Sequence, residues 1–198
     1  MTQTVTALYD NYDSAVAALR ALEAAGIPHS DISIVANNVV ERRIDAPTNA
    51  PEDAGIGAGI GAAVGGVGGL LAGLGMLAIP GVGPVVAAGW LVATAAGAAT
   101  AAAVGGIAGG IVGSLTRAGV DERDANIYAE GVRRGGTLVS ARVPDAQASI
   151  ARDVLDRHNP VDIGARAASY QRAGWRSFDE KAPPYTAAEI AAERDRYR

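Results

Sequence analysis

The residue types that most often carry catalysis or metal binding are few in this chain and widely separated. His29 falls in an expected loop and His158 at an expected helix end, and neither has a Cys, His or carboxylate partner at metal-ligand spacing. Cysteine is absent, which excludes disulfides, thiolate catalysis and iron–sulfur sites. We therefore expect solvated or capping histidines and no metal centre.

Other candidate motifs are also incomplete. The run Gly57 to Gly61 resembles a phosphate loop, but no GK[ST] follows and the GxGxxG pattern fails at its last position. Ser114 and Thr116 have no base nearby in the sequence. The acidic residues 121, 122 and 124 begin an expected helix, where they compensate its dipole. The residue inventory thus predicts a non-enzymatic protein without a cofactor.

An uncharged stretch from Ala54 to Thr116 organises the rest of the chain. It contains no Asp, Glu, Lys, Arg or His. The sequence PGVGP at Pro80 to Pro84 predicts a turn, because proline stops a helix and glycine permits a positive φ. Two apolar arms remain, 56–79 and 85–115. The first has about 24 residues and would be roughly 36 Å long as a helix, enough to cross a hydrocarbon core of about 30 Å.

Small residues recur at every fourth position in both arms. On a helix, this period gathers them into a groove that lets another backbone approach closely. A low-complexity Gly/Ala linker is the alternative, but it would not keep this register twice. The spacing predicts a glycine-zipper helical hairpin whose packing residues are Gly57, Gly61, Gly65, Gly69, Gly73, Gly89, Gly97, Gly105, Gly109 and Gly113.

Strand and helix patterns on either side of this stretch predict two halves of one α+β domain. Residues 5–9 and 32–35 read as strands around an amphipathic helix that Gly26 ends. Asp121 caps a further helix, which is followed by a strand at 137–143, another helix, and a last short strand at 161–163. Two βαβ units of this kind predict a ferredoxin-like sandwich interrupted at its midpoint.

These patterns divide the chain into five expected parts. Residues 1–45 form the first half of the sandwich, 46–53 a linker, 54–116 the hairpin, 117–164 the second half, and 165–198 an Arg/aromatic tail. The tail is expected either to be solvated and partly disordered or to dock on a neighbouring subunit through Trp175 and Phe178.

Both halves resemble a known family. The segment VTALYDNYDSAVAALRALEAAGIPHSDISIVANN resembles the start of the bacterial general stress (YflT-type, heat- or low-temperature-induced) proteins, and YAEGVRRGGTLVSARV, residues 128–143, resembles their second half. The resemblance implies a stress-linked, non-enzymatic protein and supplies no catalytic residues.

Membrane association and self-association follow as expectations from the uncharged stretch. The two halves must share a compartment, so the hairpin would cross a bilayer twice, with arginines at 42, 43, 117 and 123 as cytoplasmic flanks. The N-terminus does not resemble a signal peptide, so we expect the sandwich in the cytoplasm. The net charge of −4 and the lack of a basic patch argue against a nucleic-acid partner.

Two alternatives to a membrane-embedded hairpin stay open. In the first, the hairpins of many subunits bury one another in a soluble assembly, because an apolar surface of this size does not stay exposed on a monomer. In the second, the sandwich is a ligand-sensing module anchored by the hairpin.

Overall fold

Three strands form the centre of the sheet. Each has alternating apolar residues, and they come from distant parts of the sequence. The computed structural model describes residues 2–37, 75–79, 81–91, 93–94 and 110–197. Within them, β5 (Thr137–Pro144) lies between β1 (Thr2–Tyr9) and β2 (Ile32–Asn37) and pairs antiparallel with both. These strands fall where the sequence predicts them, and the α+β class is confirmed.

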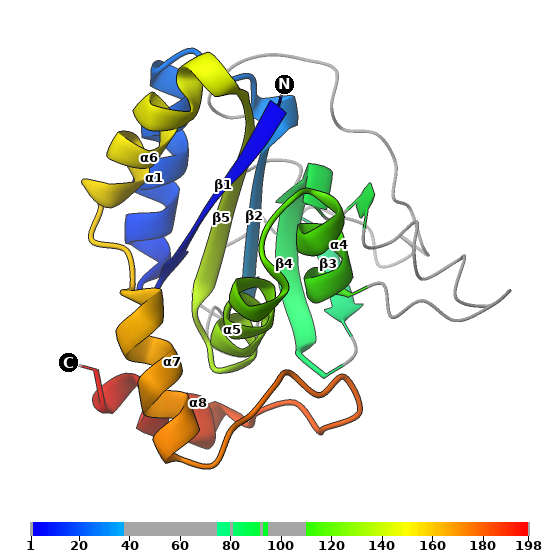
Figure 1. Ribbon diagram of the computed structural model, residues 1–198. Coiled ribbons are helices and arrows are strands. Elements are labelled where there is room, and N and C mark those ends of the chain that lie inside the picture. Colours follow the sequence, from blue (N-terminus) through cyan, green and yellow to red (C-terminus); the bar gives the residue numbers. More distant parts are fainter. Residues whose placement is uncertain (1, 38–74, 80, 92, 95–109, 198) are drawn as a thin grey trace, which may run out of the picture.

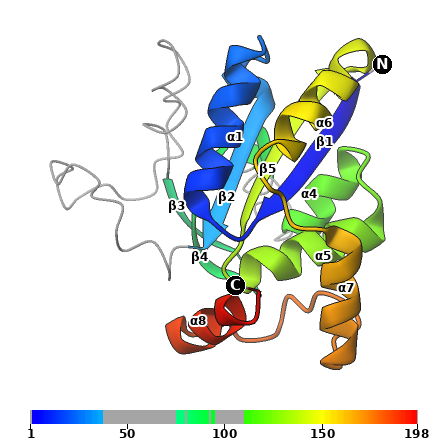
Figure 2. The ribbon, with the colours of Figure 1, turned by 90° about the vertical axis from the view of Figure 1, so that its left-hand side faces the viewer.

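Two amphipathic helices cover one face of this sheet. Figure 2 shows α1 (Tyr12–Ala24) and α6 (Ala148–Asp156) side by side in front of the strands. Short 3-10 turns, η1 (His29–Asp31) and η2 (Asp145–Gln147), precede β2 and α6. Asn11 caps α1 by accepting the backbone N–H of Asp13 at 2.8 Å. The core under these helices includes buried Leu19, Leu22 and Ile34.

A second helical layer lies on the opposite face (Figure 1). It consists of α4 (Ile111–Arg117) and α5 (Glu122–Arg133), with Asp121 as the N-cap of α5, as predicted. Buried residues of this second core include Leu8, Val35, Leu115 and Val132. The sheet is therefore covered by helices on both faces, with two separate cores.

The prediction of a helical hairpin is wrong for residues 75–89, around the centre of the uncharged stretch. Residues from both arms form strands, β3 (Gly75–Ile79) and β4 (Gly83–Gly89), which pair with each other around the predicted turn. The Val82 N–H donates to the Ile79 carbonyl at 3.0 Å, and Gly81 has a φ of +74°. This geometry matches a type II turn, in which the third residue needs a positive φ.

The strand β4 pairs antiparallel with β2, which gives a five-stranded sheet in the order β1-β5-β2-β4-β3. Two physical reasons explain the wrong prediction. A period of four is also a multiple of the strand period of two, so regular glycines do not distinguish a helix from a strand. In addition, β2 would present an open edge without β4, and unpaired strand edges tend to acquire a partner.

Two further expectations for the uncharged stretch concern a membrane-spanning helix and the zipper glycines. No helix within the described ranges is long and apolar enough to span a bilayer. The zipper positions at 57–73 and 97–109 lie outside the described residues.

The predicted last strand at 161–163 is also wrong. Only the Val161 N–H reaches the edge of β1, where it donates to the Leu8 carbonyl at 2.7 Å. Asp162 then accepts the Ala165 N–H with its side chain and caps α7 (Ile163–Arg172). A strong N-cap two residues after Pro160 favours a helix over a three-residue strand.

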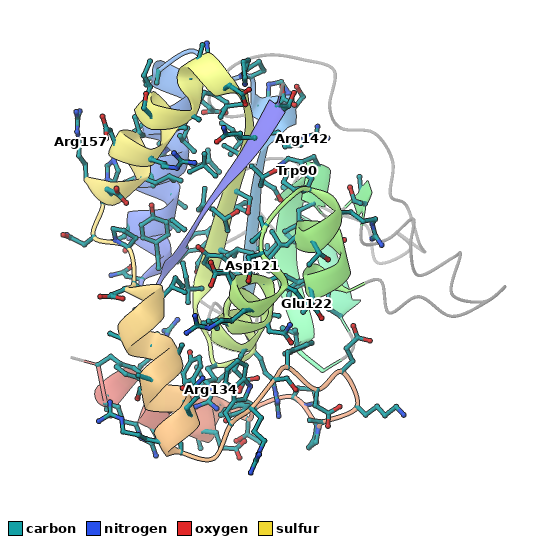
Figure 3. The ribbon with its side chains drawn as sticks, in the orientation of Figure 1. Trp90, Asp121, Glu122, Arg134, Arg142 and Arg157 are labelled. Carbon is teal, nitrogen blue, oxygen red and sulfur yellow. The ribbon has the colours of Figure 1, made fainter. Side chains whose placement is uncertain are left out.

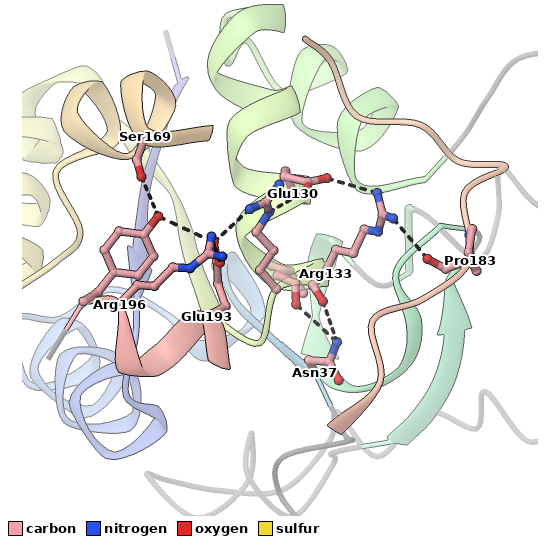
Figure 4. Close-up of polar contacts among 10 residues, drawn as sticks. Asn37, Glu130, Arg133, Ser169, Pro183, Glu193 and Arg196 are labelled. Carbon is pink, nitrogen blue, oxygen red and sulfur yellow. Dashed lines mark hydrogen bonds and ion pairs between the residues drawn. The ribbon is translucent and has the colours of Figure 1, made fainter. Parts of the chain in front are cut away.

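The C-terminal residues fold onto α5 through a buried ionic network, shown in Figure 4. Arg134 donates to Glu130 at 2.6 Å and to Glu193 of α8 (Ala187–Asp195) at 2.8 Å. Burial alone would lower the pKa of Arg134, but the hydrogen bonds to Glu193 and Glu130 outweigh it and raise the pKa. The network therefore keeps its charges and fixes α8 against α5.

An α7 residue adds a second ionic contact in the same region. Arg166 makes a two-pronged ion pair with Asp10, at 2.9 and 2.6 Å, and its guanidinium lies 3.6 Å from the Tyr197 ring centroid. Both ends of the chain are thereby joined through α7. The part of the tail that the structure describes is ordered on its own domain, contrary to the expectation of a solvated, partly disordered segment.

Replacing Glu193 with Ala should destabilise the protein by about 3 kcal/mol, because it leaves the buried Arg134 without one of its two carboxylates. The matched control is Arg196→Ala, which removes an exposed partner of the same Glu193 and should cost less than about 0.5 kcal/mol. Urea unfolding of both variants measures the difference, and equal losses would contradict the assigned role of the network.

Candidate functional site

Only two of the predicted zipper glycines lie within the described residues. Gly113 is a partly buried residue of α4, a helix of one to two turns. Gly89 ends β4 with a φ of +94°, and a Cβ at this position would collide with the Ile32 carbonyl oxygen. The role of Gly89 is therefore close strand packing beside β2, and the prediction that it packs a helix is wrong.

The two predicted tail anchors pack within their own chain. Trp175 makes an edge-on contact with Tyr170, with ring centroids 5.7 Å apart. Phe178 packs against the core under α5, near Gly81 of the β3–β4 turn, and its N–H donates to Asn126 at 3.1 Å. The Phe178 contacts hold the C-terminal segment against the β3–β4 turn.

The candidate chemical residues do not converge. His29 lies in η1 and His158 follows α6. No group of three or more metal-binding side chains is found in the part of the chain that the structure describes.

Side chains on the α4/α5 face of the sheet change from apolar to polar along the strands. One cross-strand row is Leu8, Leu138, Val35 and Ala87. The next row is Thr6, Ser140 and Ser33, and the Thr6 and Ser140 hydroxyl oxygens are 3.1 Å apart. The row beyond pairs Thr4 with Arg142. A core of Leu and Val therefore gives way to hydroxyls and then to charge at one end of the sheet.

Tyr128 of α5 borders this polar region at the outer edge of β1. Its hydroxyl donates to the Thr6 carbonyl at 3.0 Å. Burial, and then the nearby charge of Asp124, raise the pKa of Tyr128 to about 12. The hydroxyl thus keeps its proton and serves as a donor that satisfies the strand edge.

A pocket of about 600 Å³ opens at the polar end of the sheet, between the strands and α4. Figure 3 shows Trp90 and Arg142 next to each other in this region. The Arg142 guanidinium carbon lies 4.9 Å from the centroid of the Trp90 ring, and its Nη2 donates to Asp31 at 3.1 Å. The wall is completed by Ser114 and Arg117 of α4, by Ala118 at its C-cap, and by Thr2, Thr4 and Thr94. We call this the Trp90 pocket.

Two nitrogen donors in the Trp90 pocket are buried without an acceptor among the described residues. They are the indole Nε1 of Trp90, a side chain only 7% exposed, and the Nε of Arg142. A buried donor without a partner is costly, by about 1–3 kcal/mol. The pocket itself is lined by the guanidinium groups of Arg117 and Arg142 and by the carboxylate of Asp31, so positive charge is in excess.

The polar residues that β1 and β5 contribute to this site could have been found from their alternation in the sequence. The alternation Thr2, Thr4, Thr6 and the alternation Ser140, Arg142 place polar residues on a sheet face whose central row is apolar. Trp90 carries no such signal, because it belongs to the stretch that the glycine spacing assigns to a helical arm.

Comparison with known proteins finds one matching family model. Residues 4–79 match the family model described as the heat induced stress protein YflT domain. This match confirms the resemblance to the YflT-type stress proteins that the sequence of the first half indicates. No curated protein and no solved structure gives a significant match.

The geometry at Gly89 predicts a large effect of a single methyl group. Gly89→Ala should destabilise the protein by about 3 kcal/mol or more, since it adds a collision with the Ile32 carbonyl to the strain of a positive φ. The control is Gly119→Ala, where φ is +90° but nothing lies within 4 Å of an added Cβ, and the cost should be about 1 kcal/mol. Denaturant unfolding gives both values, and similar losses would contradict the close approach of β4 to β2.

Proposed function

We propose that this chain is a non-enzymatic general stress protein that acts by self-association through its uncharged stretch. The family match supports the link to stress, since the matched model describes a heat-induced domain. The match extends across the sequence from β1 to the end of β3, so it includes the start of the uncharged stretch.

The position of β3 is the observation that carries the proposal. It is the last strand in the sheet order, so no strand of the described residues pairs with its outer side. Its sequence, GMLAI, contains no charge and no proline. Native proteins usually protect such an edge with charged residues, proline or a covering element. An uncharged outer strand is suited to pairing with another chain.

The zipper glycines from Gly57 to Gly73 supply a second contact surface in the proposal. They directly precede β3 in the sequence. Self-association of this segment would shield an uncharged surface from water. The sandwich would remain in the cytoplasm with its charged faces toward solvent.

Association with a lipid bilayer through the same stretch is a second candidate. It is favoured by the absence of any charged residue from Ala54 to Thr116. The two candidates differ in what shields the stretch from water, other copies or lipid.

Sizing by light scattering in detergent-free buffer tests the proposal. The parent chain should form a multi-subunit particle, and Ala78→Lys, which places a charge on β3, should shift it toward smaller species. The matched control is Ala168→Lys, the same change at an exposed position of α7. Gly65→Leu should also weaken assembly, whereas Leu70→Ala should not.

The outcomes separate the candidates. A monomeric parent chain in plain buffer would overturn self-association. Retention in carbonate-washed membranes, with no particle in the soluble fraction, would favour the bilayer candidate over the assembly.

A further inference from the structure

The outer side of β1 is the second edge of the sheet, and part of it is open. β1 is first in the sheet order, so no strand of the described residues pairs with this side. Near the end of the strand, other groups of the chain cover the edge. The Thr6 carbonyl accepts the Tyr128 hydroxyl at 3.0 Å, and the Leu8 carbonyl accepts the Val161 N–H at 2.7 Å. Among the described residues, no comparable bond reaches the backbone of Thr4 from outside the sheet.

The pairing of β1 with β5 shows which backbone groups point outward. Thr6 lies opposite Ser140, and their hydroxyl oxygens are 3.1 Å apart. Side chains come this close at the pairs of an antiparallel ladder that exchange no backbone hydrogen bonds. The two kinds of pair alternate along the strands, so Thr4 belongs to the same kind as Thr6. The N–H groups of both threonines and the Thr4 carbonyl therefore point away from β5, toward the outer edge.

A cavity of about 330 Å³ lies along this part of the edge. The four consecutive residues 4–7 of β1 line it, and an extended segment of that length spans roughly 13 Å. Figure 1 shows β1 between α6 on one face of the sheet and α5 on the other, and both helices contribute residues to the lining. The open strand edge is thus accessible in a groove between two helices. We call it the β1 groove.

The sides of the β1 groove carry an excess of negative charge. Asp121 and Asp124 lie on the α5 side and Asp156 on the α6 side, and the cation of the lining is Arg152. The Arg152 guanidinium donates to the Gln3 side chain at 3.0 Å. The ion pairs formed within the described part of the chain use other carboxylates than these three. The groove therefore offers uncompensated carboxylates on both sides of an open strand edge.

From these observations we propose that β1 binds an extended basic segment of another protein as an added strand. The backbone of that segment bonds to the outward groups of Thr4 and to the N–H of Thr6. In this mode of recognition, main-chain bonds give affinity and alternate side chains give specificity. Alternate residues of an extended segment point to the same side. Lys or Arg at positions i and i+2 of the partner therefore faces Asp121 and Asp124.

The charge of the β1 groove also separates this partner from a second copy of the chain that pairs through β3. The sequence of β3, GMLAI, has no basic residue to match the aspartates. β3 lies at the opposite end of the sheet order. The inference therefore stands or falls independently of the proposed self-association.

Binding of an acetylated and amidated peptide, Lys-Val-Lys-Val-Lys, tests the proposal. Fluorescence anisotropy of the labelled peptide gives its affinity at about 0.15 M ionic strength, where the screening length is about 8 Å. One control peptide replaces each Lys with Glu. The other keeps the lysines but has methylated backbone nitrogens, so it cannot donate to a strand. We expect a Kd below about 1 mM for the unmodified peptide and at least tenfold weaker binding of both controls.

Amide hydrogen exchange of the complex shows where the peptide lies. Exchange of the outward N–H groups of Thr4 and Thr6 should slow when the peptide is bound, because they gain an acceptor. The N–H groups of Val5 and Ala7 point toward β5 and should not change.

Variants of the chain test the edge and its charge separately. Thr4→Pro removes an outward N–H that the β5 ladder does not use, so a strand edge tolerates it, and it should weaken binding about tenfold. The matched control is Thr4→Ala, which loses the same hydroxyl bond to Ala118 but keeps the N–H and should bind as the parent does. Asp156→Asn should weaken binding about threefold. Asp153→Asn, at an exposed position of the same helix outside the groove, should not.

Three results would overturn the proposal. The first is a methylated peptide that binds as tightly as the unmodified one, since charge alone would then explain the binding. The second is no saturable binding of the unmodified peptide up to about 5 mM, weaker than the millimolar range of ordinary weak ligands. The third is unchanged exchange of Thr4 and Thr6 at saturation. All three use the unaltered chain, so they hold even where a variant does not fold.

Discussion

The antiparallel pairing of β2 with β4 is the constraint on which the rest of this structure depends. Without it, β2 would be an open edge and the second core would lose Val85 and Ala87. The pairing also fixes the position of Gly89 beside Ile32, and so the position of Trp90 in the lining of the pocket. A segment that looks like an insertion into the domain is therefore part of its sheet.

Helix α5 connects this sheet to everything that follows it in the chain. One side of α5 contributes Tyr128 and Val132 to the sheet core. Arg134, which Glu130 of α5 holds by a hydrogen bond, binds Glu193 of α8. Between α7 and α8 the chain passes the β3–β4 turn, where Phe178 packs near Gly81. Removing one partner of a buried ion pair is strongly destabilising. The Arg134–Glu193 pair therefore links the C-terminal tail to the stability of the whole domain.

The sequence predicts the parts of the fold whose patterns have a single interpretation. Strands β1, β2 and β5, helix α5 and its Asp121 cap have clear alternation, periodicity or capping signals. The stretch around Met76 and Val85 does not, since its glycine period fits a helix and a strand equally well. Nor could the site be predicted in full. Trp90 and Arg142 are far apart in the sequence, and only the register of β4, β2 and β5 brings them together.

Amide hydrogen exchange of β4 in the intact chain tests the central claim most directly. The account predicts that the β4 amides that bond to β2, within residues 85–89, exchange as slowly as those of β5, because they open only with the sheet. Protection of the Gly89 and Ala87 region should also be lost in the Gly89→Ala variant before that of β1. Rapid exchange of β4 beside a fully protected β5 would show that the uncharged stretch is not part of the sheet, and would contradict the account.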